Sequence, residues 1–531
     1  MTSTLPNGIR LQDEWPPCGI DPASDAPMPV PYLESPPAVI PLDLGRQLFV
    51  DDFLIAENSL ERVFHQPRKH EGNPVFQPST PLETEGVHPA AVPKAGGVWW
   101  DPEARCYKMW YEAGWLGRTA YATSVDGLVW ERPSLDVEPP TNRILPEFRP
   151  DSGTVWLDLE ERDPSQRYKM LLREPQEEIG GALEGPGRCM VSSDGIHWSA
   201  AVATGRMGDR STMFYNPFRK VWVHSIRSYE SGRCRAYREH PGFLAGAAWT
   251  DEERVFWCRA DRLDLPDPLI GQAAQLYNLD AVAYESLMLG LFEIHLGPEN
   301  KVCEAEGRPK ITELNIAFSR DGFHWHRPDR SPFIAAARQD GAWDRGYVQS
   351  VGGVCLIVGD ELRFYYTGFR GDSANQRDRH GYHAGMYAHG ATGIAKLRRD
   401  GFASLRAGAL EQSVLTRPVT FTGGHLFVNA VGTLRAEVCT EQGVPIPGFT
   451  AADCLETTGD HTKAGVHWRG NANLESLVGQ PVRFRFYLQN GDLYAFWVSR
   501  EATGASTGYV AAGGPGFTSS RDLPSTSQPA E

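Results

Sequence analysis

One seven-residue pattern, S-x-D-G-x-x-W, occurs three times in this chain of 531 residues and limits what the chain can fold into. The copies begin at Ser124 (SVDGLVW), Ser192 (SSDGIHW) and Ser319 (SRDGFHW). Asp-Gly supplies the backbone of a tight turn, and the Trp is a large apolar side chain that packs back against a sheet. The pattern lacks the ligands of a metal site and the lysine of a phosphate-binding loop. It therefore predicts a repeated structural turn.

Hairpin-forming sequence surrounds the repeats. Segments such as VWWDPEARCYKMWYEAG consist of an apolar strand, a turn and a strand of aromatic or β-branched residues. A degenerate fourth copy lies at Asp400, and Pro241-Gly242 with Trp249 replaces the pattern in the long interval between 194 and 321. Five such units, each a small antiparallel sheet, are typical of a β-propeller. Hairpins of this kind begin at Val98, Thr154 and Thr212, and a further one lies near residue 354.

The predicted fold class is all-β, with a five-bladed β-propeller over residues 39–407 and a C-terminal β-sandwich over residues 408–510. Period-two alternation without the repeat, as in PVRFRFYLQNGDLYAFWV, predicts the sandwich. Residues 1–38 are rich in proline and are expected to wrap the surface as an irregular segment. Residues 511–531 are rich in Gly, Ser and Pro, which predicts a disordered tail.

Composition argues against several classes of protein. The formal net charge of −15 gives no general attraction to nucleic acid or to anionic membranes. No run approaches the ~20 apolar residues of a membrane helix, and the first residues lack the features of a signal peptide. The nine cysteines are scattered singly, without the spacing of a zinc site or a disulfide framework. We therefore expect a cytoplasmic protein without metal or cofactor; a homo-oligomer is compatible with the sequence.

One polar cluster precedes the predicted inner strand of each blade. Inner strands line the channel of a propeller, so these clusters are expected to meet in a pocket at one rim. Like charges separate the pKa values of neighbouring carboxyl groups, which lets one site hold both an acid and a base. The anchors His88, Asp151, Asp209, Tyr277 and Asp344 follow at intervals of 63, 58, 68 and 67 residues. The predicted catalytic residues are Asp151, Asp209, Asp344 and Glu285. The predicted substrate-binding residues are His88, Arg210, Tyr277, Asn278, Asp280, Tyr284, Trp343, Arg345 and Gln349.

Two other groups of polar residues are weaker candidates. Asp51 and Asp52 are paired carboxylates, but they precede the first blade and are expected on a peripheral strand. The run RDRHGYHAGMYAHG contains His380, His383 and His389. The first two are spaced for a metal, yet no carboxylate partner is evident. We interpret the run as a long loop of the fifth blade that covers the pocket.

The assembled motifs resemble those of a known group of enzymes. GNPVF from Gly72, a strand ending YKMWYEAG, and YATSVDGLVWERP look like the five-bladed furanosidase-type propellers of glycoside hydrolase families 32, 43, 68 and 117. A propeller followed by a sandwich is similar to family 32, and LFVDDFLI with TGIAKLRRDGFASL and LFVNA resembles a bacterial family-32-like branch. Asp151 and Asp209 fall at the depth of two acidic residues of these families. His88 stands where they place an Asp.

The resemblance implies a glycoside hydrolase or transglycosylase that uses carboxylates as acid and base. Its expected partner is a small oligosaccharide substrate, with fructose- or arabinose-containing sugars as the first candidates. Two alternatives stay open: a non-catalytic carbohydrate-binding propeller, and a propeller enzyme of another kind, such as a lyase or a sialidase-like hydrolase. The repeat resembles the Asp-box of sialidases shortened by one residue. Sialidases have six blades and an arginine triad, whereas this sequence predicts five blades and no clear triad.

Overall fold

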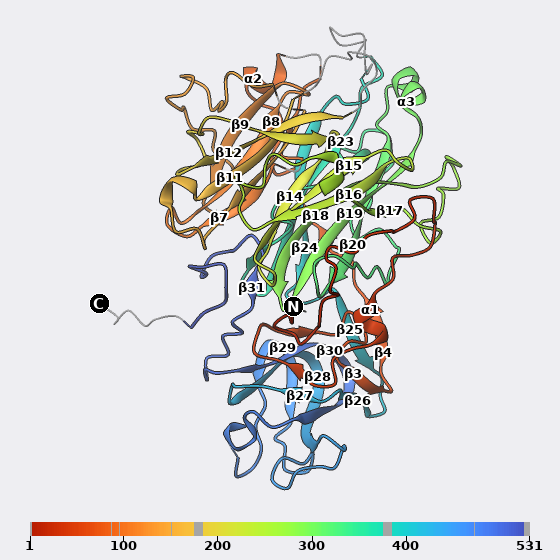
Figure 1. The fold of residues 1–531 in the computed structure, drawn as a ribbon, viewed down its shortest axis with the longest axis vertical. Coiled ribbons are helices and arrows are strands. Elements are labelled where there is room, and N and C mark those ends of the chain that lie inside the picture. Colours follow the sequence, from red (N-terminus) through yellow and green to blue (C-terminus); the bar gives the residue numbers. More distant parts are fainter. Residues whose placement is uncertain are drawn as a thin grey trace.

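A computed structural model describes residues 3–85, 88–94, 96–149, 151–174, 184–374, 385–471 and 473–524. Within these residues the helices are short: α1 (Pro31–Glu34), α2 (Pro81–Thr84) and α3 (Asn300–Glu306). Nearly all other regular structure is β-strand, so the predicted all-β class is confirmed. Figure 1 shows a larger β domain above a smaller one along the long axis. None of the described helices has the length and apolar character needed to span a bilayer.

The larger domain is the predicted five-bladed propeller, built from five separate antiparallel sheets. Blade one contains β6 (Ala91–Val92), β7 (Val98–Asp101), β8 (Cys106–Ala113) and β9 (Arg118–Ser124). Blade two contains β10 (Ser152–Leu157), β11 (Tyr168–Arg173), β12 (Gly185–Ser192) and β13 (Val202–Met207). Blade three contains β14 (Thr212–Asn216), β15 (Val221–Ser228), β16 (Cys234–His240) and β17 (Val255–Arg259). Blade four contains β18 (Gln275–Glu285), β19 (Leu287–Gly297), β20 (Ile311–Ser319) and the C-terminal β31 (Tyr509–Val510). Blade five contains β21 (Gly346–Ser350), β22 (Leu356–Val358), β23 (Glu361–Phe369), β24 (Gly390–Arg398) and β5 (Arg68–Lys69).

The S-x-D-G-x-x-W repeat forms the same turn in blades one, two and four. In blade four, Oδ1 of Asp321 accepts hydrogen bonds from the backbone N–H groups of Phe323 and His324 at 2.9 and 2.8 Å. Oγ of Ser319 accepts one from the N–H of Gly322 at 2.8 Å, and Gly322 has φ of 81°, where glycine is favoured. The other two copies make the equivalent bonds. The three copies of the repeat thus share one local role, which is to form this turn.

Each of these turns also contacts the preceding blade. The carbonyl of Gly195 in blade two accepts a hydrogen bond from Nε1 of Trp110 in blade one at 2.7 Å. The carbonyl of Asp321 in blade four accepts one from Nδ2 of Asn216 in blade three at 3.3 Å. The third pair joins Gly127 in blade one to Tyr365 in blade five. The repeat therefore forms a turn within its own blade and also makes a hydrogen bond to the preceding blade.

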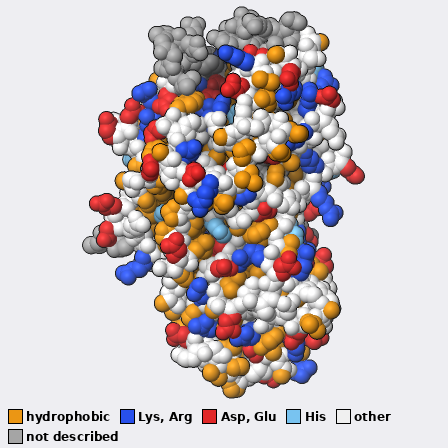
Figure 2. Space-filling model, turned by 90° about the vertical axis from the view of Figure 1, so that its right-hand side faces the viewer, with side chains coloured by type: hydrophobic (Ala, Val, Ile, Leu, Met, Phe, Trp, Pro, Cys, Tyr) orange, Lys and Arg blue, Asp and Glu red, His pale blue; other side chains and the backbone are white. Residues whose placement is uncertain are grey.

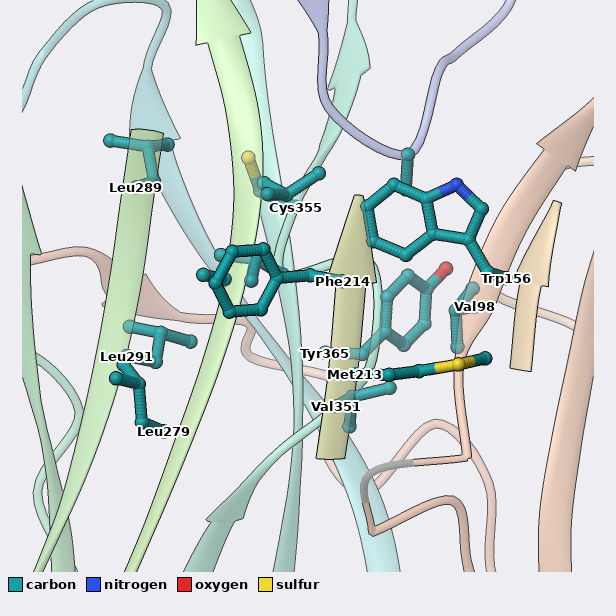
Figure 3. Packing of buried hydrophobic residues seen from close by; sticks show 14 of the residues in the cluster. Val98, Trp156, Met213, Phe214, Leu279, Leu289, Leu291, Val351, Cys355 and Tyr365 are labelled. Atoms are coloured by element: carbon teal, nitrogen blue, oxygen red, sulfur yellow. The ribbon is translucent and has the colours of Figure 1, made fainter. Parts of the chain in front are cut away.

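A single apolar cluster joins the five blades. Figure 3 shows part of it, with Val98, Trp156, Phe214, Leu279 and Val351 coming from blades one to five in turn. All five side chains are buried. Burial of apolar surface stabilises by roughly 25 cal/mol per Å², so this shared core holds the ring together. The ring is closed by β5, which precedes blade one in the sequence yet pairs with β24 of blade five.

The smaller domain is one ten-stranded sheet that folds over a second core, as expected for a β-sandwich. Its longest strands, β28 and β30, pair along most of their length. Residues 40–64, which we expected in the propeller, supply four strands here, because they pair with C-terminal strands that lie far away in the sequence. The strands are β1 (Ile40–Pro41), β2 (Gln47–Leu48), β3 (Ile55–Asn58), β4 (Glu61–Phe64), β25 (Ala403–Ala407), β26 (Gln412–Thr416), β27 (Val419–Thr420), β28 (His425–Thr440), β29 (Thr457–Gly465) and β30 (Val482–Ser499).

The chain returns to the propeller after the smaller domain. We expected disorder from residue 511, but Ala512 is 2% exposed and its carbonyl accepts a hydrogen bond from the N–H of Trp100 in blade one at 3.0 Å. Its own N–H bonds to Cys355 in blade five, also at 3.0 Å, and β31 pairs with β18 of blade four. Small residues allow this close approach: a Cβ at Gly514 would lie 1.7 Å from the carbonyl oxygen of Ile357. Residues 525–531 lie outside the described structure.

The N-terminal segment is irregular apart from α1 and runs along blades three and four. The Trp15 ring lies 5.5 Å from that of Phe323, measured between centroids. Nη1 of Arg259 donates a hydrogen bond to the carbonyl of Pro22 at 3.0 Å. These contacts agree with a segment that wraps the surface of the propeller.

Candidate active site

Asp151 and Asp209 stand at the starts of the inner strands of blades two and three. Asp151 directly precedes β10, and its Oδ2 lies 2.7 Å from Nη1 of Arg173. Asp209 shortly precedes β14, and its Oδ1 lies 2.5 Å from Nη1 of Arg227. The same oxygen accepts a hydrogen bond from the Tyr229 hydroxyl at 3.0 Å. The negative charge of Asp209 raises the pKa of Asp151, which indicates that the two carboxyl groups lie close together. The structure thus brings together two of the four predicted catalytic carboxylates.

The hairpin register explains why each carboxylate meets an arginine. Arg173 ends β11 and lies opposite Ser152, the first residue of β10. Arg227 lies near the end of β15, and its carbonyl accepts a hydrogen bond from the N–H of Gly208 at 3.1 Å. Sequence reasoning missed both arginines. The signal was present, since LLRE and SIRS each place an arginine at the end of the second strand of a recognised hairpin.

The pKa values of the two carboxyl groups are shifted in opposite directions. Burial raises the pKa of Asp151, and the negative charge of Asp209 raises it further, against Lys94 and Arg173. Burial also acts to raise the pKa of Asp209, but Arg227, Arg173 and the Tyr229 hydroxyl outweigh it and lower that pKa. The surroundings thus move the two pKa values apart, upward for Asp151 and downward for Asp209. A separation of this kind suits acid–base catalysis by two carboxyl groups.

A cluster of buried aromatic side chains lies beside the carboxylates. Tyr277, a predicted substrate-binding residue, places its hydroxyl 2.8 Å from that of Tyr347. Trp115 stacks on Tyr387 with 3.8 Å between the ring centroids, and Tyr347 lies 5.2 Å from Tyr387. Cζ of Arg227, which pairs with one of the carboxylates, lies 4.7 Å from the Tyr277 centroid. The rings therefore pack on one another and on the arginine next to the carboxylates.

Lys94 connects blade one to this site. Its Nζ donates a hydrogen bond to the carbonyl of Asp151 at 3.1 Å and lies 2.7 Å from Oε2 of Glu112. The same ammonium group lies 3.9 Å from the ring centroid of Trp115. Burial raises the pKa of Glu112, and Lys94 opposes this shift. Lys94 thus contacts the backbone of Asp151, the Glu112 carboxylate and the Trp115 ring at the same time.

A buried ion pair from blades three and four lies next to Tyr277 and Tyr347. Nη2 of Arg210 is 3.1 Å from Oε2 of Glu293, with side chains 2% and 0% exposed. Burial raises the pKa of Glu293 to about 7, and Arg210 opposes this shift. Nε and Nη1 of Arg210, Oε1 of Glu293 and both amide atoms of Gln349 make no hydrogen bond within the described residues. Buried polar atoms of this kind suit the hydroxyl groups of a polar ligand.

Asn278 and Asp280 lie on the same inner strand, β18, and belong to a buried network. Nδ2 of Asn278 donates a hydrogen bond to Oδ2 of Asp280 at 2.9 Å, and Ser350 donates to the same oxygen. Nη2 of Arg235 donates to Oδ1 of Asn278 at 3.2 Å. Burial raises the pKa of Asp280. These two predicted residues therefore lie on the inner strand near the Arg210 ion pair. The positive charge of Arg210 opposes the rise in the pKa of Asp280.

Glu285 and Tyr284 do not meet the carboxylate pair. We expected the run QLYNLDAVAYESL to precede an inner strand, but residues 275–285 are the inner strand itself. At about 3.4 Å per residue, Glu285 is roughly 27 Å along the strand from Tyr277. It pairs with Arg399 at 3.1 Å, while the Tyr284 hydroxyl donates to Asp400 at 2.6 Å. Both side chains are buried at the end of the propeller next to the smaller domain.

Asp344 and its neighbours also lie apart from the pair. Oδ2 of Asp344 is 2.6 Å from Nζ of Lys69 in β5, the outermost strand of blade five, and accepts a hydrogen bond from Tyr366 at 3.0 Å. Trp343 packs on Tyr366 at 5.3 Å and lines a separate cavity of about 250 Å³. Arg345 forms an ion pair with Asp340. The contacts of these three predicted residues hold the outer part of the blade together.

The predicted histidines and paired carboxylates have different surroundings. His88 is 3% exposed in blade one, and its carbonyl accepts a hydrogen bond from the N–H of Trp115 at 3.0 Å. His380 and His383 lie outside the described residues, and Nε2 of His389 is 3.4 Å from Oδ2 of Asp372. The described chain contains no group of three or more His, Cys, Asp or Glu side chains placed to hold a metal ion. Asp51 forms a buried pair with Arg320 at 2.8 Å.

Comparisons with known proteins give distant likenesses. No protein-family model and no curated protein matches the sequence. The N-acetylgalactosamine deacetylase from F. plautii, solved with blood group B trisaccharide, has a TM-score of 0.44 and 16% identity, covering 66% of this chain and 96% of that one. A putative glycoside hydrolase from Bacteroides ovatus has a TM-score of 0.38 and 12% identity, covering 63% and 97%. The exo-beta-1,3-galactanase from Phanerochaete chrysosporium, solved with beta-1,3-galactotriose, has 0.33 and 8%, covering 82% and 99%. Scores and identities this low assign no activity to this chain.

Proposed function

We propose that this protein is a glycoside hydrolase, or a transglycosylase, that cleaves a glycosidic bond at the end of the channel where Asp151 and Asp209 stand. One observation carries the proposal. Two carboxyl groups from neighbouring blades lie at the same end of the channel, and their surroundings shift their pKa values apart. Binding alone has no need of such a division, whereas cleavage of a glycosidic bond needs one protonated and one ionised carboxyl group.

Each carboxyl group has a role that follows from its contacts. Asp151, whose pKa is raised by burial and by Asp209, acts as the acid and donates a proton to the glycosidic oxygen as the bond to the anomeric carbon breaks. Asp209, kept ionised by Arg227 and Tyr229, either attacks the anomeric carbon or removes a proton from the attacking water. A sugar hydroxyl in place of that water gives transfer instead of hydrolysis. The ring of Tyr277 and the buried polar atoms around Arg210 orient a small oligosaccharide beside them.

The first experiment incubates the purified protein with fructans, sucrose, difructose anhydrides, arabinans, galactans and sialosides, and identifies products by chromatography and mass. Asp151→Asn and Asp209→Asn are expected to lower turnover roughly 10²- to 10⁴-fold with little change in melting temperature. Asp136→Asn, at a largely exposed carboxylate, is the matched control. Unchanged turnover in both site variants would sink the proposal.

The same assay separates the alternatives. Saturable glycan binding without any product indicates a binding propeller, an unsaturated sugar product indicates a lyase, and release of sialic acid indicates a sialidase-like hydrolase. Asp344→Asn and Glu285→Gln test whether the other two carboxylates that the sequence predicted as catalytic have a structural role instead. Both variants are expected to lower the melting temperature, since each breaks an ion pair whose carboxylate is buried. Loss of turnover without loss of stability would return them to the catalytic set.

A further inference from the structure

Three cationic side chains surround one aromatic ring at the edge of the candidate active site. Relative to the Tyr277 centroid, Cζ of Arg227 lies at 4.7 Å, Nζ of Lys310 at 5.4 Å and Cζ of Arg233 at 5.7 Å. Asp209 neutralises Arg227. Over the described ranges, neither Lys310 nor Arg233 forms an ion pair with a carboxylate. Like charges held this close repel one another, so the arrangement is unfavourable unless an anion lies among them.

Lys310 is the most constrained of the three. It is 2% exposed, and its Nζ lies 4.8 and 5.3 Å from the ring centroids of Tyr347 and Tyr387. Burial and the charges of Arg233 and Arg227 lower the pKa of Lys310 to about 7. A bound anion would raise it again. The charged and titratable groups that face this amine are Arg227, Arg233, Asp209, His295, Cys303, Tyr277, Tyr347 and Tyr387.

A cavity of about 320 Å³ lies beside this cluster and is lined by Arg233, Gln275 and His295. Nη1 of Arg233 donates a hydrogen bond to Oε1 of Gln275 at 3.1 Å, which orients the guanidinium group. Glu299 also lines the cavity, but it pairs with neither surplus cation. The chain as a whole has a net charge of −15, and Figure 2 shows acidic and basic side chains interspersed on one face. The local surplus of cations is therefore a property of this site and not of the composition.

We infer that the substrate carries an anionic group, the carboxylate of a sugar acid or a sulfate ester, and that Arg233 and Lys310 bind it next to Asp151 and Asp209. The inference rests on the proposed function and narrows its substrate class to acidic glycans. The planar guanidinium offers paired N–H donors that match two oxygens of either anion, and the lysine adds a point charge. The tyrosine rings keep the Lys310 ammonium buried, which strengthens its attraction to an anion.

Titration calorimetry tests this with oligogalacturonates and sulfated galactooligosaccharides against neutral galactooligosaccharides of the same length. The acidic glycans are expected to bind on the order of tenfold more tightly or better. Added salt reduces the preference. Raising the pH through about 7 also reduces it, because Lys310 loses its proton. The stronger of the two acidic ligands identifies the anion as carboxylate or sulfate.

Two variants assign the effect to the named cations. Arg233→Gln and Lys310→Met are expected to abolish the preference for acidic glycans while neutral glycans bind as before. Arg233 is only partly buried, so its variant keeps the test valid should Lys310→Met fail to fold. Arg206→Gln, an exposed arginine paired with Asp251, is the matched control.

The outcomes separate this inference from the proposed function. Equal affinity for acidic and neutral glycans, or no binding of any acidic glycan at millimolar concentration, overturns the inference. Cleavage of neutral glycans alone, dependent on Asp151 and Asp209, overturns it too and leaves the hydrolase standing. Binding of acidic glycans that requires Arg233 and Lys310 but yields no product supports the inference and refutes the hydrolase.

Discussion

The turn of blade four allows a quantitative test of what the S-x-D-G-x-x-W repeat contributes. Asp321→Ala removes the oxygen that accepts the N–H groups of Phe323 and His324. Phe323 is 0% exposed, so water does not replace the lost partner. Each buried N–H left without a partner costs about 1 to 3 kcal/mol. Two such groups predict a loss of about 2 to 6 kcal/mol in the free energy of unfolding.

Blade one supplies the matched comparison. Oδ1 of Asp126 accepts the N–H groups of Leu128 and Val129 at 2.8 and 2.9 Å, the same two bonds. Here Val129 is 70% exposed, so water reaches the turn after Asp126→Ala. The expected loss is below about 1 kcal/mol, because a solvated donor recovers most of its hydrogen bonding.

Urea unfolding and calorimetry of both variants and the wild type measure the difference. The larger loss in the blade-four variant should appear as a lower denaturant midpoint at an unchanged slope. Equal losses in the two variants, or a blade-four loss within about 0.5 kcal/mol of zero, would refute the reasoning that burial sets the contribution of each turn.

The remaining predictions concern the C-terminal segment, pH and the site. Gly514→Ala places a Cβ 1.7 Å from a backbone oxygen and should lower the melting temperature, whereas Gly408→Ala, with open space, should not; equal melting temperatures contradict this. Burial lowers the pKa of His224 to about 3, so the unfolded chain binds a proton that the folded protein does not between about pH 6.5 and 3. The free energy of unfolding should therefore fall as pH drops across that window, and His224→Phe should flatten the fall; an unchanged slope argues against it. Arg227→Met should raise the pKa of Asp209 and move the acid limb of the kcat/KM profile up by about one pH unit or more; an unmoved limb removes Asp209 as the ionised group.

The sequence by itself determined the blades. The turns Asp-Pro, Asn-Pro and Asp-Gly act over a few residues, and hydrophobic alternation marks the strands between them, so five units were recognisable without any tertiary information. The same local signals placed Asp151 and Asp209 at the starts of inner strands, where the structure has them. Local chemistry was sufficient because these features depend only on near neighbours in the chain.

Tertiary structure decided which side chains meet. Glu285 and Tyr277 lie on one strand, but the strand runs the length of the channel, so they end at opposite rims. Lys310 and Arg233 precede strands of different blades, and no sequence pattern predicted that they would meet. In the structure both lie next to the ring of Tyr277.

Strand pairing between distant parts of the chain could not be predicted from the sequence for the same reason. Residues 40–64 complete the smaller domain, and the segment after residue 508 returns to pair with β18. A strand's alternation shows that it has a buried face, but not which distant strand lies beside it. That choice depends on the free energy of the whole assembled core, which no local stretch of sequence contains.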